Sequence, residues 1–180
     1  MIPTETLVKK LWTKYHLPKA KQVHVSLVAT VAEFLAVRCK ETSDVLHINI
    51  PLLVASALLH DIDKAVPKLP GEQHPEGAVR ILNTEGMNEL ARVVRTHALQ
   101  CILSSHTRPR TWEERLLYLA DKMVKQEIIT VDARFALWRS EVLPENARKI
   151  LDQTYPKVKA LEKEIFQFIH VKPDDVAKLV

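Results

Sequence analysis

Apolar residues recur every three or four positions along most of this chain, and no stretch alternates between apolar and polar residues as a half-buried strand would. Proline, glycine and short polar runs separate the apolar stretches, as expected at helix ends. The pattern predicts helices over residues 4–15, 19–40, 51–59, 75–85, 88–103, 111–128, 132–141, 144–153 and 156–170, with a last turn within 174–180. We therefore expect an all-α protein folded as a helical bundle.

The predicted helix over residues 51–59 is apolar nearly all round, which is typical of the central helix of a bundle. It runs directly into His60 and Asp61. Burying an unpaired imidazole or carboxylate is costly, and a divalent metal ion would be a partner for both. The alternative is a helix that simply becomes polar at its end, with His60 near the negative end of the helix dipole and Lys64 beyond it.

Further His and Asp residues lie on apolar faces or at the starts of other predicted helices: His24, His74, His97 and Asp121. Each alone could be a hydrogen-bonded core residue, and Lys122 or Lys125 could neutralise Asp121 without a metal. Together with His60 and Asp61 they make six inward polar residues from five successive helical segments. Independent core residues explain such a set poorly, so the pattern favours a metal site.

Length and composition indicate one globular domain. The chain has 180 residues, of which 47% are hydrophobic and only three are glycine, and this excludes a disordered or fibrous protein. A net charge of +4, with a pI near 9.1, lacks the dense Lys/Arg stripe of a dedicated nucleic-acid binder. The same charge suits an anionic small substrate.

Cys39 and Cys101 lie far apart and have no CxxC partner, which favours a reducing compartment. The N-terminus does not have the pattern of a signal peptide. The longest apolar run, Pro51 to Leu59, is much shorter than the ~20 residues of a membrane span. We expect a cytoplasmic protein that does not contact membranes.

Three motifs resemble a known family. His24, His60-Asp61 and Asp121 follow the H…HD…D order of the HD-domain metal-dependent phosphohydrolases. "LLHDIDK" is similar to the family's "LLHDIGK", "HPEGAVRIL" to its following histidine helix, and "YLADKM" to its closing aspartate helix. Asp63 departs from the family's usual glycine, at a position that is not expected to supply a ligand.

The resemblance covers about residues 20–130. It implies an HD metal-binding core over 20–130. The length predicts a single domain over 1–180, or one with a terminal extension, and residues 131–180, which have no ligand spacing, are expected to form a C-terminal helical cover. The cover could also provide the surface of a homodimer.

The resemblance also implies a ligand set. One metal would be bound by His24, His60, Asp61 and Asp121. His74 and His97 match the additional histidines of binuclear HD proteins, in which the aspartate of the HD pair bridges to a second metal. Iron or manganese would suit these ligands best, with nickel, cobalt, zinc or magnesium as alternatives.

Two such ions, ~3.5–4 Å apart, can activate a shared water and neutralise phosphoryl oxygens, so no side-chain nucleophile is needed. Lys64 lies at the family's usual cationic position and is the first candidate for binding phosphate, beside Asp61 in the catalytic centre. A polar loop adds further candidates, for which a plain solvated loop is the alternative: His106, Arg108 and Arg110.

The leading functional hypothesis is hydrolysis of a phosphate ester or anhydride of a nucleotide-like small molecule by a metal-activated water. Among binuclear members, the HD-type symmetrical dinucleoside tetraphosphatases have a similar pattern, while nucleoside monophosphates and cyclic nucleotides are alternative substrates. HD-domain di-iron oxygenases use essentially the same six ligands and form a second hypothesis. A non-catalytic metal-binding signalling module is a third, but it should lack some ligands and none is missing.

Overall fold

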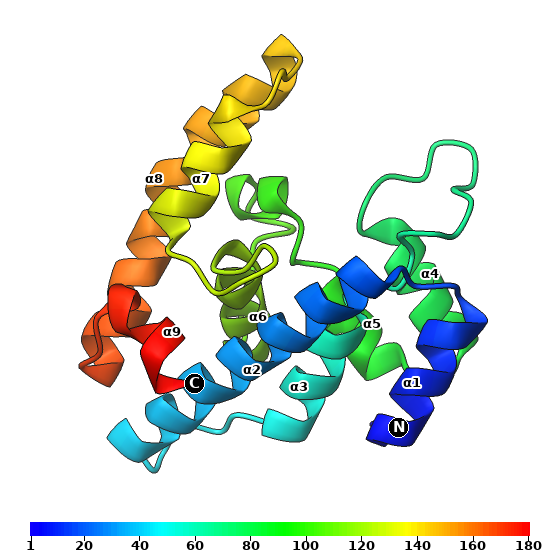
Figure 1. The fold of residues 1–180 in the computed structure, drawn as a ribbon. Coiled ribbons are helices and arrows are strands. Elements are labelled where there is room, and N and C mark those ends of the chain that lie inside the picture. The colour runs from blue at the N-terminus through cyan, green and yellow to red at the C-terminus, as the bar shows by residue number, and fades with distance from the viewer.

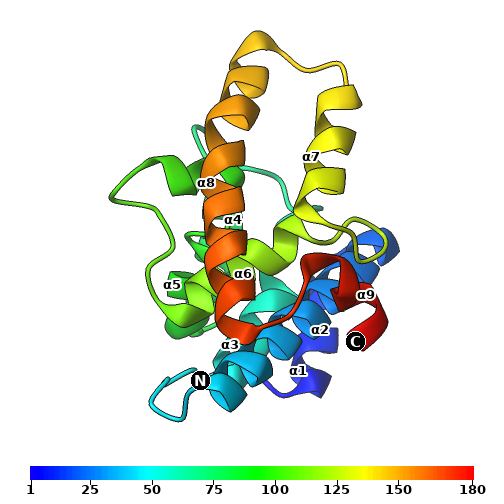
Figure 2. The ribbon, with the colours of Figure 1, turned by 90° about the vertical axis from the view of Figure 1, so that its left-hand side faces the viewer.

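The computed structural model describes residues 1–180 and contains helices but no strand, which confirms the predicted all-α fold. The body and its extension consist of α1 (Glu5–Lys14), α2 (Lys19–Thr42), α3 (Ile50–Leu59), α4 (Glu76–Thr84), α5 (Asn88–Val94), the 3-10 helix η1 (Leu99–Leu103), α6 (Trp112–Lys122), α7 (Val131–Ser140), α8 (Glu145–Ile169), the 3-10 helix η2 (Pro173–Asp175) and α9 (Val176–Leu179). Helices α1 to α6 gather into one body, and α7 with the first half of α8 projects from it as a hairpin (Figures 1 and 2).

Helix α3 lies at the centre of the body, where it packs against α2, α5 and α6. Its small residues Ala55 and Ala57 are buried and allow close helix approach. The start of α3 is fixed by the Asn49 side chain, which accepts a hydrogen bond from Leu52 N at 3.0 Å, with Pro51 in the first turn. This buried helix delivers His60 and Asp61 into the interior, as the sequence predicted.

The single helix predicted over 88–103 is wrong, because α5 ends at Val94 and η1 begins at Leu99. At the break, the Thr96 hydroxyl donates to Val93 O at 3.2 Å and His97 Nδ1 lies 2.6 Å from Val94 O. Side chains thus form hydrogen bonds with carbonyl groups that would have accepted backbone N–H groups in a longer helix. As a result His97 lies in a buried turn and not on a helix face.

The helix predicted over 111–128 has the expected start but ends early. Thr111 and Glu114 form the predicted capping box at the start of α6. The helix ends at Lys122, and a tight turn with a bridge between Val124 and Ile128 follows. Asp121 therefore lies in the last turn of α6 rather than in the middle of a long helix.

The two helices predicted over 144–153 and 156–170 are wrong as separate elements, since α8 is continuous and contains Pro156. Proline cannot donate to the carbonyl four residues earlier, which belongs to Asp152. Asp152 is exposed, so water can satisfy that carbonyl without breaking the helix. The second half of α8 packs on η1, α2 and α6 and covers one side of the body, whereas its first half extends beyond the body with α7.

Helix α2 is long and apolar enough to cross a membrane, by length and composition only. Half of that apolar stretch is buried inside this fold, so the feature is weak evidence for a span.

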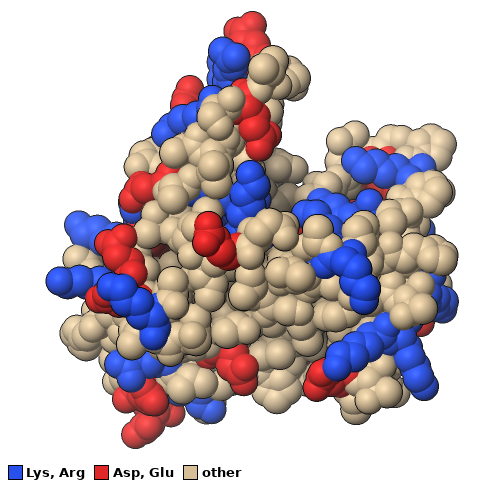
Figure 3. Space-filling view, in the orientation of Figure 1, with Lys and Arg blue, Asp and Glu red and all other residues tan.

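On the surface, a hollow lies between the α7–α8 hairpin and the lobe formed by the 60–75 loop, with Lys and Arg side chains at its edges (Figure 3).

Candidate metal centre

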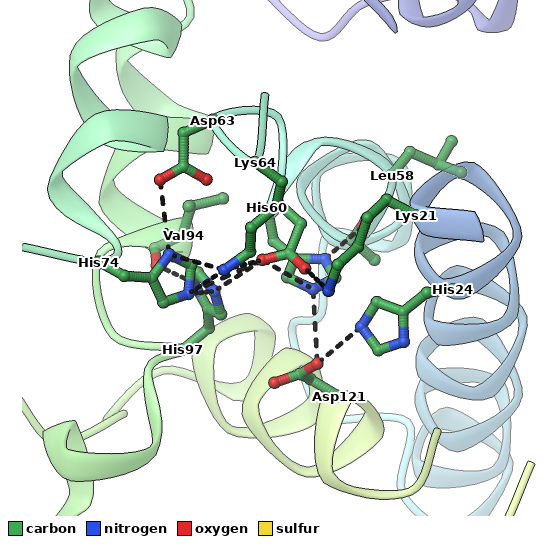
Figure 4. A network of polar contacts seen from close by, with 12 residues as sticks. Lys21, His24, Leu58, His60, Asp63, Lys64, His74, Val94, His97 and Asp121 are labelled. Atoms are coloured by element: carbon green, nitrogen blue, oxygen red, sulfur yellow. Dashed lines mark hydrogen bonds and ion pairs between the residues drawn. The ribbon is translucent and has the colours of Figure 1, made fainter. Parts of the chain in front are cut away.

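The six predicted ligands meet in one cluster. His24 and Asp121 lie in α2 and α6, and the other four lie in the turns after α3, before α4 and after α5. Figure 4 shows the cluster from close by. Neighbouring imidazole rings lie close together: the centroids of His24 and His60 are 5.4 Å apart, those of His60 and His97 4.9 Å, and those of His97 and His74 4.7 Å. The Asp121 carboxylate lies beside His24 at one end of this row. The Asp61 carboxylate lies beside the other three histidines.

Three of the histidines are held in the orientation that a metal ligand needs. The Nδ1 atoms of His24, His60 and His97 lie 3.1, 2.7 and 2.6 Å from the backbone oxygens of Lys125, Ala57 and Val94. A carbonyl oxygen only accepts hydrogen bonds, so each Nδ1 carries a proton, and in the neutral ring that a metal requires Nε2 presents the lone pair. This backbone support is what fixes ligating histidines in metal sites.

The Nε2 atom of His60 has no donor beside it. The ring is fully buried, and Nε2 has no hydrogen-bond partner. Its neighbours are carboxylate oxygens: Asp121 Oδ1 lies at 3.5 Å and Asp61 Oδ1 at 3.9 Å. An orphaned buried acceptor among further acceptors is unfavourable unless a cation binds there.

Distances between the ligand atoms also fit bound ions. Three groups have ligand atoms within 4.8 Å of one another: His24–His60–Asp121, His60–Asp61–His97 and Asp61–Asp63–His74. His24 Nε2 lies 3.0 Å from Asp121 Oδ1, and His97 Nε2 lies 2.9 Å from His74 Nε2. Two adjacent ligands with bonds of about 2.1 Å on one octahedral ion would be about 3.0 Å apart. The clustered His and Asp residues could therefore bind metal ions.

Asp61 is the residue common to both halves of the cluster. Its Oδ1 lies 3.9, 3.7 and 3.9 Å from the Nε2 atoms of His60, His74 and His97. Burial would raise the pKa of this carboxyl, but His60 and Lys64 outweigh burial and hold the pKa well below its usual range. A single ionised carboxylate thus faces three imidazoles, as a bridging ligand would.

Asp121 is shared between a lysine and two histidines. Lys122 Nζ donates to Asp121 Oδ2 and to His97 O, both at 2.6 Å, and its side chain is only 2% exposed. Burial would raise the pKa of Asp121, but Lys122 and His24 outweigh it and lower the pKa well below its usual value. The alternative account of Asp121, neutralisation by Lys122, thus holds for Oδ2, while Oδ1 still faces the histidines. Lys125 contributes its backbone oxygen to His24.

The protonation of the rings reflects these surroundings. Burial, together with His60 and His74, lowers the pKa of His97 well below its usual value, so its ring is neutral as a ligand must be. Burial also opposes the charged form of His60, but Asp61 and Asp121 outweigh it and raise the pKa. The carboxylates therefore favour positive charge at the position of His60 Nε2.

Two residues in the cluster were not predicted as members. Lys21 Nζ donates to Asp61 Oδ2 at 2.9 Å, and Asp63 Oδ2 lies 3.5 Å from His74 Nδ1. Lys21 lies one helical turn before His24, and that spacing could have indicated its position. No such spacing indicates Asp63, because it follows the end of α3, where the direction of the chain depends on tertiary contacts.

The predicted phosphate-binding residues separate into different places. Lys64 Nζ lies 3.1 Å from Asp61 Oδ1, at the cluster. Arg108 and Arg110 line a cavity of about 500 Å³ against α8, among whose lining residues there is no predicted metal ligand. His74 instead lines a cavity of about 900 Å³ with Arg95. His106 is exposed and lines neither cavity.

An all-α body with an internal row of histidines and two aspartates defines a class of helical metal-binding proteins, and the comparisons with known proteins agree. The profile of the HD domain family matches residues 23–125, more than half of the chain. The chain therefore belongs to the HD domain family, within the superfamily of metal-dependent phosphohydrolases. No curated protein and no solved structure gave a significant match.

Proposed function

We propose that this protein is a metal-dependent phosphohydrolase that cleaves a phosphate ester or anhydride of a nucleotide-like small molecule. The observation that carries the proposal is the convergence of imidazole and carboxylate lone pairs around the orphaned His60 Nε2, with lysines beside them. His24, His60, Asp61 and Asp121 would hold one ion. His74, His97 and Asp61 would hold a second.

Divalent ions bound there would supply Lewis acidity, which lowers the pKa of water and offsets phosphoryl charge. Lys21 contacts Asp61 Oδ2 and Lys64 contacts Asp61 Oδ1. The two lysine side chains are 38% and 30% exposed. They are thus partly open to a ligand and can donate hydrogen bonds to phosphoryl oxygens. Lys64 orients the phosphoryl group beside Asp61, and we include Lys21 in the same role.

The cavity beside His74 supports a substrate of nucleotide size. Its volume of about 900 Å³ falls within the range of sites for small organic ligands. Arg95 and Gln100 lie among its lining residues and can bind polar or anionic groups. Because Arg108 and Arg110 line a different cavity, we assign the main phosphate contacts to Lys64, Lys21 and Arg95.

Two measurements on the same purified sample test the proposal: metal content by elemental analysis, and phosphate release from a panel of nucleotides with and without added manganese or iron. The expected result is about two ions per chain and metal-dependent phosphate release, with several divalent ions supporting turnover. Two irons without phosphate release, and a requirement for the mixed-valent state, would indicate the oxygenase alternative. A protein that binds no metal would overturn the proposal.

A further inference from the structure

Asp63 occupies a position in the cluster that the ligand set does not explain. Its side chain is 8% exposed, and its Oδ1 atom is buried without a hydrogen-bond partner. The start of α4 packs directly against it, since a Cβ on Gly77 would lie 2.9 Å from Asp63 Oδ2 and 3.0 Å from Asp63 Cβ. Only glycine at position 77 leaves room for this buried carboxylate. The fold thus accommodates a charge that has no complete set of partners within the chain.

His74 differs from the other three histidines in how its ring is supported. Their Nδ1 atoms face backbone oxygens, whereas His74 Nδ1 faces the Asp63 carboxylate at 3.5 Å. His74 Nε2 points the other way, toward His97 Nε2 at 2.9 Å and Asp61 Oδ1 at 3.7 Å. Figure 4 shows the ring of His74 between Asp63 on one side and His97 on the other.

The proton on His74 must be on Nδ1 if Nε2 is to bind a metal. His97 Nδ1 already donates to Val94 O, so His97 Nε2 has a lone pair directed at the same space. Lys64 Nζ lies 3.3 Å from His74 Nδ1 and 3.5 Å from His74 Nε2, but an ammonium group only donates and cannot accept the Nδ1 proton. Asp63 Oδ2 is the acceptor that faces Nδ1.

We infer that Asp63 is a positioning residue that accepts the Nδ1 proton of His74 and so directs His74 Nε2 to the second metal ion. The inference rests on the proposed binuclear site. A carboxylate behind a ligating imidazole fixes its orientation and makes the ring a stronger donor, and loss of such a partner costs 10- to 100-fold in metal affinity. The contrasting role is that of a direct ligand, since Asp63 also has an oxygen near Asp61 and His74.

The test compares Asp63→Ala and Asp63→Asn with the wild type, using zinc titration calorimetry and nitrogen NMR of the imidazoles in the zinc-loaded protein. Asp63→Ala should weaken the second ion about 10- to 100-fold and leave the first ion unchanged. Asp63→Asn should restore much of the affinity, because its amide oxygen still accepts from Nδ1. The wild-type spectrum should show His74 protonated at Nδ1, and Asp63→Ala should shift that signal.

The matched control is Asp44→Asn, an exposed carboxylate beyond the far end of α2, which should behave as wild type. Gly77→Ala adds a variant that removes no functional group but crowds Asp63, and it should weaken the second ion in the same way. Unchanged second-ion affinity in both Asp63→Ala and Gly77→Ala overturns the inference. The inference is also overturned if Asp63→Asn binds the second ion as weakly as Asp63→Ala does while its His74 Nδ1 signal stays as in the wild type. That result would indicate that Asp63 is a direct ligand.

Failure of the proposed function gives a different result. If the wild type binds no zinc, manganese or iron, the phosphohydrolase proposal fails. The pairing of Asp63 with His74 is then judged on the metal-free protein. A shift of the His74 nitrogen signals in Asp63→Ala, and not in Asp44→Asn, supports the pairing, and no shift overturns it.

Discussion

Two regions of this molecule group charged side chains around a buried carboxylate, Glu162 in one and Asp61 in the other. They differ in whether the charges are matched within the chain. Between α7 and α8, Asp132 accepts hydrogen bonds from Tyr155 Oη at 2.6 Å and from Lys159 Nζ at 2.8 Å. Lys159 also pairs with Glu162. In the metal centre, by contrast, several imidazole and carboxylate acceptors face one another, and His60 Nε2 has no donor.

The difference separates a structural cluster from a binding site. The α7–α8 cluster is complete except for Glu162 Oε1, which is buried without a partner. It can hold the two helices together without any ligand. The metal centre is a set of acceptors in need of a cation, since lysines satisfy only Asp61 and one oxygen of Asp121. Both regions contain a buried carboxylate, and the excess of acceptors around Asp61 identifies the candidate site.

The largest effect is expected from Asp61→Ala, which removes the carboxylate shared by both halves of the centre. It should abolish metal binding and turnover while the helical circular dichroism spectrum is retained. Asp132→Ala, the control from the α7–α8 cluster, should keep metal content and lose only stability. A protein with Asp61→Ala that still bound two ions and turned over normally would contradict the binuclear centre.

Lys64→Ala should act on the substrate and not on the metals. A hydrogen bond to a charged group contributes about 1.5–3 kcal/mol, so KM for a phosphorylated substrate should rise roughly 10- to 100-fold. Metal content by elemental analysis should be unchanged. Lys68→Ala, an exposed lysine in the same loop, is the control. An equal rise of KM in both variants would indicate a general loss of loop charge.

Glu162→Gln tests the one buried carboxylate oxygen of the α7–α8 cluster that has no hydrogen-bond partner, Glu162 Oε1. Burial raises the pKa of Glu162 above its usual 4.5, although Lys159 opposes this shift. Between pH 4.5 and the raised pKa the folded state holds more protons than the unfolded state, so stability falls as pH rises through this window.

The Gln variant lacks that ionisation, so its stability should not fall through this window and it should be the more stable protein at neutral pH. Lys159 keeps Asp132 as its partner. Urea unfolding at pH 4.5 and pH 7.5 measures the difference. Lower stability of the variant at pH 7.5 would show that the Lys159–Glu162 pair outweighs the cost of burying the charge.

The smallest effect is expected from the double substitution of Arg108→Ala and Arg110→Ala. Both residues are exposed and line the cavity against α8, away from His74. Surface substitutions of this kind change free energies by about 0.5 kcal/mol, so KM should change by about twofold or less. A tenfold rise would show that the substrate extends from the metal centre to this cavity.

Periodicity predicted the helices and the inward direction of His24 and Asp121, because an apolar stripe defines the buried side of a helix. It failed where side chains or single residues decide a helix end. His97 was assigned to a helix, but Thr96 and His97 end α5 by bonding its last carbonyls. Pro156 was expected to separate two helices, but the unpaired carbonyl faces water.

The six candidate ligands could be chosen from the sequence because their order matches a family pattern. The spacing of Lys21 from His24 indicates its side of the helix, but the partners of Lys21 and Asp63 could not be predicted, because each contact depends on the fold. Lys21 meets a residue 40 positions away. Asp63 lies close to His74 because the 63–74 segment folds back on the end of α3.

The contact between His24 and Asp121 joins residues that are 97 positions apart. An ion held by both would close a chain loop of that length, as a disulfide does in secreted proteins. Closing a long loop removes many conformations from the unfolded chain. The metal would then serve as a removable staple between the first and last helices of the HD core, and chelation would loosen the whole body as well as stop the chemistry.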